Sequence, residues 1–150
     1  MNTDIMFSSK TDQWETPQDF FNELNLEFKF TLDPCADENN HKCEKYYTKE
    51  QDGLLQDWKN ERVFCNPPYG REIRSWVRKC YLHSRSGNGI AVMLIPARTD
   101  TKWFHEYIYN KKDVEVRFIK GRIKFGGANY NAPFPSMIVI FREENSLSKH

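Results

Sequence analysis

The segment Val63-Phe64-Cys65-Asn66-Pro67-Pro68-Tyr69-Gly70 decides the fold, because a short apolar run ends at a turn that contains two prolines. The apolar run is typical of a buried strand. Each proline fixes φ and removes a backbone donor, so the turn is stiff and its carbonyl groups are left as acceptors. The segment therefore predicts a strand with a rigid polar turn at its carboxyl end, which is where open α/β sheets bind ligands.

Predicted helices and strands alternate on both sides of this turn. In chain order they are a helix with Thr16 as N-cap and Pro17 at its first position, a strand at 28–33, the strand at 63–65, a helix at 73–81, a strand at 89–96, a helix at 103–110, and strands at 114–125 and 137–141. Residues 35–60 are weakly patterned. The alternation predicts an α/β fold, with a mostly parallel sheet, helices on both faces and an antiparallel edge strand.

The composition is that of a globular chain, since 39% of the 150 residues are hydrophobic and 29% are charged. This length predicts a single domain over 1–150, with an ordered core at about 8–142. No apolar run approaches the roughly 18 residues of a membrane span, and the first residues do not form a secretory signal. We therefore expect a cytoplasmic protein without a membrane partner.

The four cysteines do not predict a metal site. Cys35, Cys43, Cys65 and Cys80 form no CxxC pair, which a zinc ribbon or a redox dithiol would contain. A site built from Cys35, His41 and Cys43 with a remote ligand is the weaker alternative. We expect four reduced thiols and no metal.

Charge is divided unevenly along the chain. Residues 1–75 contain nine basic and fifteen acidic side chains, whereas residues 76–150 contain thirteen basic and six acidic ones. A basic second half favours a polyanionic partner, and carboxylates in the first half can accept hydrogen bonds from a small ligand. Two solvated faces are the alternative interpretation.

The turn after the 63–65 strand suits the chemistry of an aromatic amine. The lone pair of such an amine is delocalised into its ring, which makes the nitrogen a weak nucleophile. Asn66 and the backbone carbonyls up to Pro68 can accept its two hydrogens, and this favours the geometry in which the lone pair is free to attack. Tyr69 can stack on the ring.

These residues resemble the catalytic motif of S-adenosylmethionine-dependent amino methyltransferases that act on adenine. The wider chain resembles the small phage Dam-type DNA N6-adenine methyltransferases. The matching segments are Trp14-Glu15-Thr16-Pro17, Asp33-Pro34-Cys35-Ala36, Asp52-Gly53-Leu54 with Asp57-Trp58, the turn at 66–70, PARTDTKWF at 96–104 and GRIKF at 121–125. The resemblance implies a Rossmann-like methyltransferase fold. Its sheet is expected to be trimmed, because the stretch between Asp33 and Asn66 is too short for the two strands and two helices of larger relatives. The chain also lacks the glycines that those relatives carry after Asp-Pro, which bears on the details of its cofactor contacts.

The resemblance also implies roles for individual residues. The methyl donor is S-adenosylmethionine, and its predicted contacts are Trp14, Thr16, Pro17, Asp33, Pro34, Cys35, Ala36, Asp52 and Asn66. Asp57 competes with Asp52 for the amino group of the donor's adenine. The predicted catalytic residues, which hold and stack an adenine flipped out of double-stranded DNA, are Asn66, Pro67, Pro68 and Tyr69.

DNA contacts are expected from the basic second half, since no separate recognition domain fits into the chain. The predicted contacts are Arg122, Lys124, Asn129, Tyr130 and Asn131 in the segment 121–135, with Arg98 and Lys102 in a rival loop. Three alternatives are methylation of a protein glutamine, methylation of adenine in RNA, and a non-catalytic DNA-binding protein that retains the fold. We expect a monomer or a weak dimer.

Overall fold

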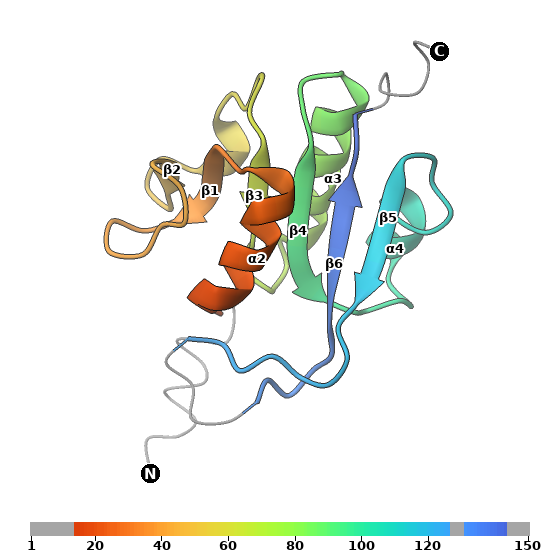
Figure 1. The fold of residues 1–150 in the computed structure, drawn as a ribbon. Helices are drawn as coiled ribbons and strands as arrows, with labels where there is room; N and C mark the ends of the chain where they lie inside the picture. Colours follow the sequence, from red (N-terminus) through yellow and green to blue (C-terminus); the bar gives the residue numbers. More distant parts are fainter. Residues whose placement is uncertain (1–13, 127–130, 144–150) are drawn as a thin grey trace.

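A twisted sheet of six strands forms the centre of the computed structural model, which describes residues 14–126 and 131–143 (Figure 1). The strand order is β2-β1-β3-β4-β6-β5. The strands are β1 (Leu32–Ala36), β2 (Lys45–Thr48), β3 (Val63–Cys65), β4 (Ala91–Pro96), β5 (Val114–Phe118) and β6 (Ser136–Phe141). β3, β4 and β6 are buried along their whole length, so the core lies in the middle of the sheet.

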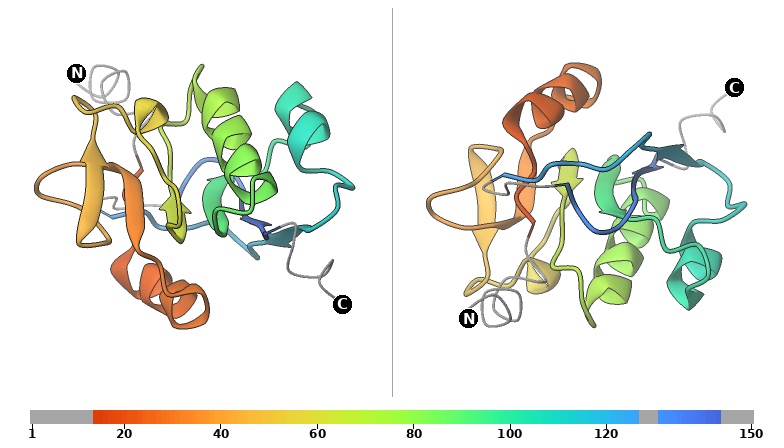
Figure 2. Two further views of the ribbon diagram at one scale, coloured as in Figure 1. Left: turned by 90° about the horizontal axis from the view of Figure 1, so that it is seen from above. Right: turned by 90° about the horizontal axis from the view of Figure 1, so that it is seen from below.

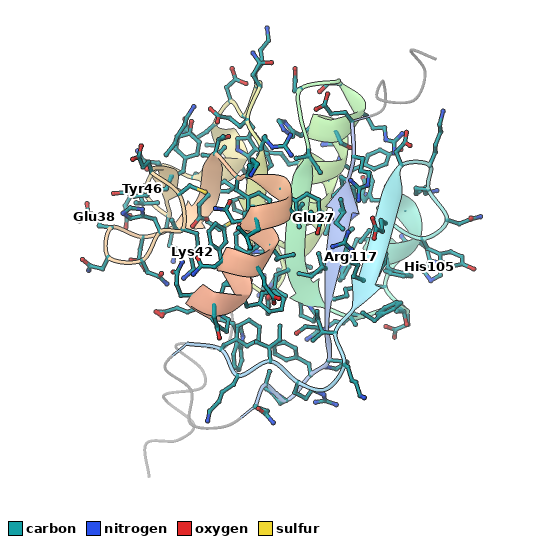
Figure 3. The ribbon with its side chains drawn as sticks, in the orientation of Figure 1. Glu27, Glu38, Lys42, Tyr46, His105 and Arg117 are labelled. Atoms are coloured by element: carbon teal, nitrogen blue, oxygen red, sulfur yellow. The ribbon has the colours of Figure 1, made fainter. Side chains whose placement is uncertain are left out.

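Helices cover both faces of the sheet (Figure 2). α2 (Gln18–Phe28) lies on one face, where Phe21 packs edge-on against Phe64 of β3 with ring centroids 5.1 Å apart. The other face carries η1 (Gly53–Leu55), α3 (Ile73–Arg85) and α4 (Lys102–Tyr107). Near the far edge of the sheet, Arg117 of β5 reaches α2 and forms a two-pronged ion pair with Glu27 (Figure 3).

The strand directions confirm the predicted fold class. β2, β1, β3 and β4 are parallel to one another, whereas β6 is antiparallel to both of its neighbours. The edge strand β5 is therefore antiparallel to its partner, as predicted, but the strand that runs against the rest is β6, which lies inside the sheet. The sheet is also trimmed, because only β2 and η1 lie between β1 and β3.

Three sequence predictions near the amino terminus and the carboxyl end of the sheet are wrong in detail. Thr16 is not a helix cap, since Pro17 occupies the N-cap position of α2 and no side chain caps it. The strand predicted at 28–33 begins only at Leu32, because Phe28 ends α2 and Lys29 reverses the chain with a φ of 53°. The strand predicted at 114–125 ends at Phe118, and residues 119–126 instead cross beneath the carboxyl ends of the strands (Figure 1).

Strand β1 contains a proline, which the sheet accommodates by a shift in register. β1 pairs with β2 at Asp33 and again at Ala36, and the two pairings are out of step. A bulge at this place removes the need for a backbone donor at Pro34. Gly53 packs directly on the bulge, since a Cβ atom on it would lie 2.3 Å from the Pro34 carbonyl oxygen.

Within the described ranges, no helix is long and apolar enough to cross a membrane, and no three potential metal-ligating side chains gather into a group. His41 stacks on Tyr46 with the ring centroids 3.9 Å apart, and its Nδ1 pairs with the Cys43 carbonyl. The side chains of the alternative cysteine–histidine site are thus not assembled around a common point.

Candidate active site

A pocket of about 750 Å³ opens where β1 and β3 end. Its volume lies within the roughly 300–1,000 Å³ that is usual for small-molecule sites. Of the nine predicted donor-binding residues, the eight that line it are Trp14, Thr16, Asp33, Pro34, Cys35, Ala36, Asp52 and Asn66. The ninth, Pro17, is the N-cap of α2. The fold therefore brings together segments that are far apart in sequence, while their contact with a donor stays a prediction.

Asn66 is the best-defined polar group of the pocket. Its amide nitrogen donates to the Trp14 carbonyl and to Thr16 Oγ1, the latter at 2.9 Å. Its Oδ1 atom is buried and has no hydrogen-bond partner among the described residues. A buried polar atom without a partner carries a free-energy penalty of about 1–3 kcal/mol. The side chain is thus fixed at its donor end and presents an unsatisfied acceptor.

Pro67 and Pro68 complete the predicted turn beside this amide. Both line the pocket together with Gly70, Arg71 and Glu72, and the turn leads directly into α3. Since neither proline has a backbone N–H, the turn contributes carbonyl acceptors at this end of the pocket.

Tyr69 is built into the core beneath the turn. Its hydroxyl group donates to the Leu94 carbonyl at 2.8 Å, and its ring packs edge-on against Phe125 and Phe134. Burial raises the pKa of the Tyr69 phenol well above its usual value, so the side chain is a neutral hydrogen-bond donor. Its predicted stacking on a target base stays a prediction.

Asp33 organises the wall of the pocket. It is only 5% exposed, and its two oxygens accept from the backbone N–H groups of Cys35 at 3.2 Å and Lys42 at 2.9 Å. Burial raises the pKa of the Asp33 carboxyl, and these two backbone donors oppose the shift. The carboxylate therefore ties the β1 bulge to the loop that carries Lys42, whose position in that loop is shown in Figure 3.

The structure separates the two candidate aspartates, Asp52 and Asp57. Asp52 lines the pocket, has a positive φ of 56°, and accepts from the Leu54 N–H at 3.1 Å. Asp57 is exposed, lies outside the pocket lining, and accepts from the Lys59 N–H at 2.9 Å. The geometry favours Asp52 as the acidic residue of a donor site.

Among the cysteines near the pocket, Cys65 and Cys80 are buried, whereas Cys35 is half-buried and belongs to the pocket lining. Cys35 Sγ lies 3.7 Å from Cys65 Sγ, and all four cysteines are free. Burial raises the pKa of Cys35, and it raises the pKa of Cys65 and Cys80 well above the usual thiol value. A thiol that stays protonated is a poor nucleophile and a poor metal ligand.

The predicted DNA-contacting residues fall into an exposed set and an undescribed pair. Asn129 and Tyr130 lie outside the described residues. The exposed residues are Arg98, Lys102, Arg122, Lys124 and Asn131. Arg98 lies in the loop after β4 and Lys102 is the first residue of α4, whereas the other three lie in the two described parts of the segment 121–135. DNA contact by these residues stays a prediction.

Arg71 was missed by the sequence analysis. It is exposed and lines the pocket, directly after the 66–70 turn. Its position next to Gly70 was a usable signal, because a residue between this turn and the following helix lies close to the side chains of the turn. Lys42 was also missed, since the polar stretch around it has no recognisable period.

Comparison with known proteins identifies the family. The family model described as DNA N-6-adenine-methyltransferase (Dam) matches residues 4–148. The DNA N-6-adenine-methyltransferase of Haemophilus phage HP1 (strain HP1c1) is 34% identical over 140 residues, which cover 89% of this chain and 80% of that protein. The protein of the same name from Escherichia phage T1 is 37% identical over 105 residues, which cover 69% of this chain but only 43% of the phage T1 protein. The chain therefore belongs to the DNA N-6-adenine-methyltransferase (Dam) family of adenine-specific DNA methyltransferases.

Proposed function

We propose that this chain transfers a methyl group from S-adenosylmethionine to the N6 amino group of an adenine that is flipped out of double-stranded DNA. The family assignment supports adenine in DNA over a protein glutamine or an RNA adenine. The observation that carries the proposal is the Oδ1 atom of Asn66, a buried acceptor without a partner among the described residues, on a side chain that belongs to the pocket lining.

The pocket suits a nucleoside that carries an amino acid. It combines carboxylates, which can accept from amino and hydroxyl groups, with apolar surface from Pro34, Phe64 and Trp76. Asp33 lies in β1 and Asp52 is the N-cap of η1, and both carboxylates would hold the donor. When bound, S-adenosylmethionine supplies an electrophilic methyl group on a sulfonium. The chain's own task is to hold this group and the target amine in line.

Asn66 and the Pro67 carbonyl would hold the target amine. Each accepts one of its two hydrogens, which draws the nitrogen lone pair out of conjugation with the ring and directs it at the methyl group. Alignment of this kind can lower a barrier by about 7–11 kcal/mol. Flipping the base costs a few kcal/mol, which contacts to the phosphates and to the flipped base offset.

The exposed cations near the pocket would bind the DNA backbone. Arg71 lies at the pocket itself, and Arg122 and Lys124 lie in the segment that crosses beneath the sheet. We extend the proposal to one domain over 1–150 that acts as a monomer or a weak dimer.

The direct test is product identification. The purified protein is incubated with labelled S-adenosylmethionine and unmethylated double-stranded DNA, the DNA is digested, and the labelled nucleoside is identified. We expect N6-methyladenosine in its deoxy form. Label in protein, in RNA added as a competitor, or in another nucleoside would contradict the proposal.

Asp52 and Asp57 give a matched pair for donor binding. Asp52→Asn keeps a side chain that tolerates a positive φ and can still accept from Leu54, so the turn should persist. We expect a roughly fivefold weaker affinity for S-adenosylmethionine by calorimetry, because a hydrogen bond to a charged group contributes about 1 kcal/mol more than a neutral one. Asp57→Asn should leave the affinity unchanged. Equal affinities in both variants would show that Asp52 does not bind the donor's amino group.

Arg71 and Arg78 give a similar pair for DNA binding. Both side chains are exposed. Arg71 lies just before α3 and Arg78 lies on it, but of the two only Arg71 lines the pocket. Arg71→Ala should raise the KM for DNA severalfold and reduce the salt dependence of binding by about one counterion, as expected for one lost phosphate contact. Arg78→Ala should change neither quantity by as much. If donor affinity falls instead of DNA affinity, Arg71 binds the donor's carboxylate.

A further inference from the structure

We propose that Thr16 is a positioning residue for Asn66, and that it acts with the Trp14 carbonyl to fix which end of the Asn66 amide faces the target amine. The sequence predicted two other roles for Thr16, a helix cap and a donor contact. The first is wrong, because Pro17 is the N-cap of α2. The inference rests on the proposed function, since it concerns the orientation of the proposed catalytic acceptor.

The orientation of the amide follows from the chemistry of its two partners. A main-chain carbonyl can only accept, so the Trp14 oxygen requires the nitrogen end of the Asn66 side chain. Thr16 Oγ1 lies 2.9 Å from the same nitrogen and accepts its second hydrogen. If the amide were turned over, Oδ1 would face the Trp14 oxygen, and two acceptors would meet in a buried place. Both hydrogens are therefore engaged and Oδ1 is left over.

Thr16 is placed for this role more firmly than a surface residue would be. It is only 5% exposed, so its hydroxyl cannot exchange its partner for bulk water at little cost. The two residues before it are also anchored. The Trp14 ring packs edge-on against Phe125 and Phe134, and the Glu15 carbonyl accepts from the Gly126 N–H at 2.8 Å.

These anchors come from the segment that contains the predicted DNA contacts. Phe125 and Gly126 follow Arg122 and Lys124 in the stretch that crosses beneath the sheet. The chain from Trp14 to Thr16 thus connects that stretch to the catalytic turn. Because Trp14 and Thr16 are hydrogen-bonded to Asn66, the position of the Asn66 side chain depends on the position of that stretch.

The test uses two substitutions of Thr16 that differ by one hydroxyl group. Thr16→Val keeps the shape but removes the acceptor, and Thr16→Ser keeps the acceptor. We expect Thr16→Val to lower kcat about 5–10-fold, the value of one ordinary hydrogen bond. The KM for DNA should stay unchanged, and Thr16→Ser should restore kcat.

A wild-type kcat in Thr16→Val would overturn the inference. A loss confined to the affinity for S-adenosylmethionine would also overturn it, because Thr16 would then be a donor contact only. Asn66→Asp is the second variant, and its kcat should fall at least tenfold although it keeps the acceptor, because its other oxygen meets the Trp14 carbonyl. A near wild-type Asn66→Asp would also overturn it. Failure of the proposed function is distinct, because there the labelled product would not be N6-methyldeoxyadenosine in the wild-type protein.

Discussion

Replacing Asn66 by alanine is expected to lower kcat about 10²–10³-fold, the usual effect of removing one preorganised polar contact to a transition state. The variant loses the unpartnered Oδ1 that would hold the target amine. It should still fold, since the side chain makes hydrogen bonds to just two of the residues that the structure describes, Trp14 and Thr16, and the β3 strand beneath it stays buried.

The measurement is a single-turnover rate with saturating DNA and labelled S-adenosylmethionine, accompanied by donor affinity from calorimetry. Donor affinity should change little. Asn22→Ala, on the exposed side of α2, serves as the control and should keep the wild-type rate. An Asn66→Ala enzyme that turns over at the wild-type rate would show that the amine is held elsewhere.

Gly53→Ala is expected to give the largest loss of stability. The added Cβ would lie 2.3 Å from the Pro34 carbonyl oxygen and 3.0 Å from the Trp76 ring. Because the nearer atom belongs to the main chain, the clash can be relieved only if η1 moves away from the β1 bulge. We expect the free energy of unfolding to fall by roughly 3 kcal/mol, the upper end for overpacking. For a chain of this size, that lowers Tm by about 6–12 °C.

Gly121→Ala is the comparison for this prediction. Gly121 has a φ of 76° but no atom within 4 Å of the position of a Cβ. Only backbone strain opposes the substitution there, and the expected loss is about 1–2 kcal/mol. Thermal unfolding of the two variants separates crowding from strain. Equal shifts in Tm would mean that the contact between η1 and β1 yields easily.

Sequence patterns predicted the elements whose burial is local and regular. β3 has the bounds that were expected, and α3 buries Ile73, Trp76, Val77 and Cys80 at the predicted helical spacing. β2 was missed because it is a short, half-exposed edge strand with a single neighbour, so its residues follow no clean alternation. The strand expected at 114–125 was too long because Ile123 and Phe125 are buried beneath the site instead of in the sheet.

The residues of the candidate site were predictable from the sequence, but the hydrogen bonds between them were not. The motifs named ten of the residues that line the pocket, namely eight predicted donor contacts together with Pro67 and Pro68, because each motif follows a strand end or precedes a helix. The hydrogen bond from Asn66 to Thr16 could not be predicted, since its partners are 50 positions apart and Thr16 also suits a helix cap. The choice between Asp52 and Asp57 depended on which one the η1 turn directs inward.

The anchoring of Trp14 and Glu15 by Phe125, Phe134 and Gly126 bears on the order in which the protein matures. A ribosome releases the amino-terminal residues first, and contacts between distant parts of a chain form late in folding. The segment that is proposed to orient Asn66 is therefore made before the residues that anchor it, and it is fixed only once they have been made. Nascent chains that already contain the 66–70 turn still lack this support, so the proposed orientation of Asn66 is secured only after Phe134 has been synthesised.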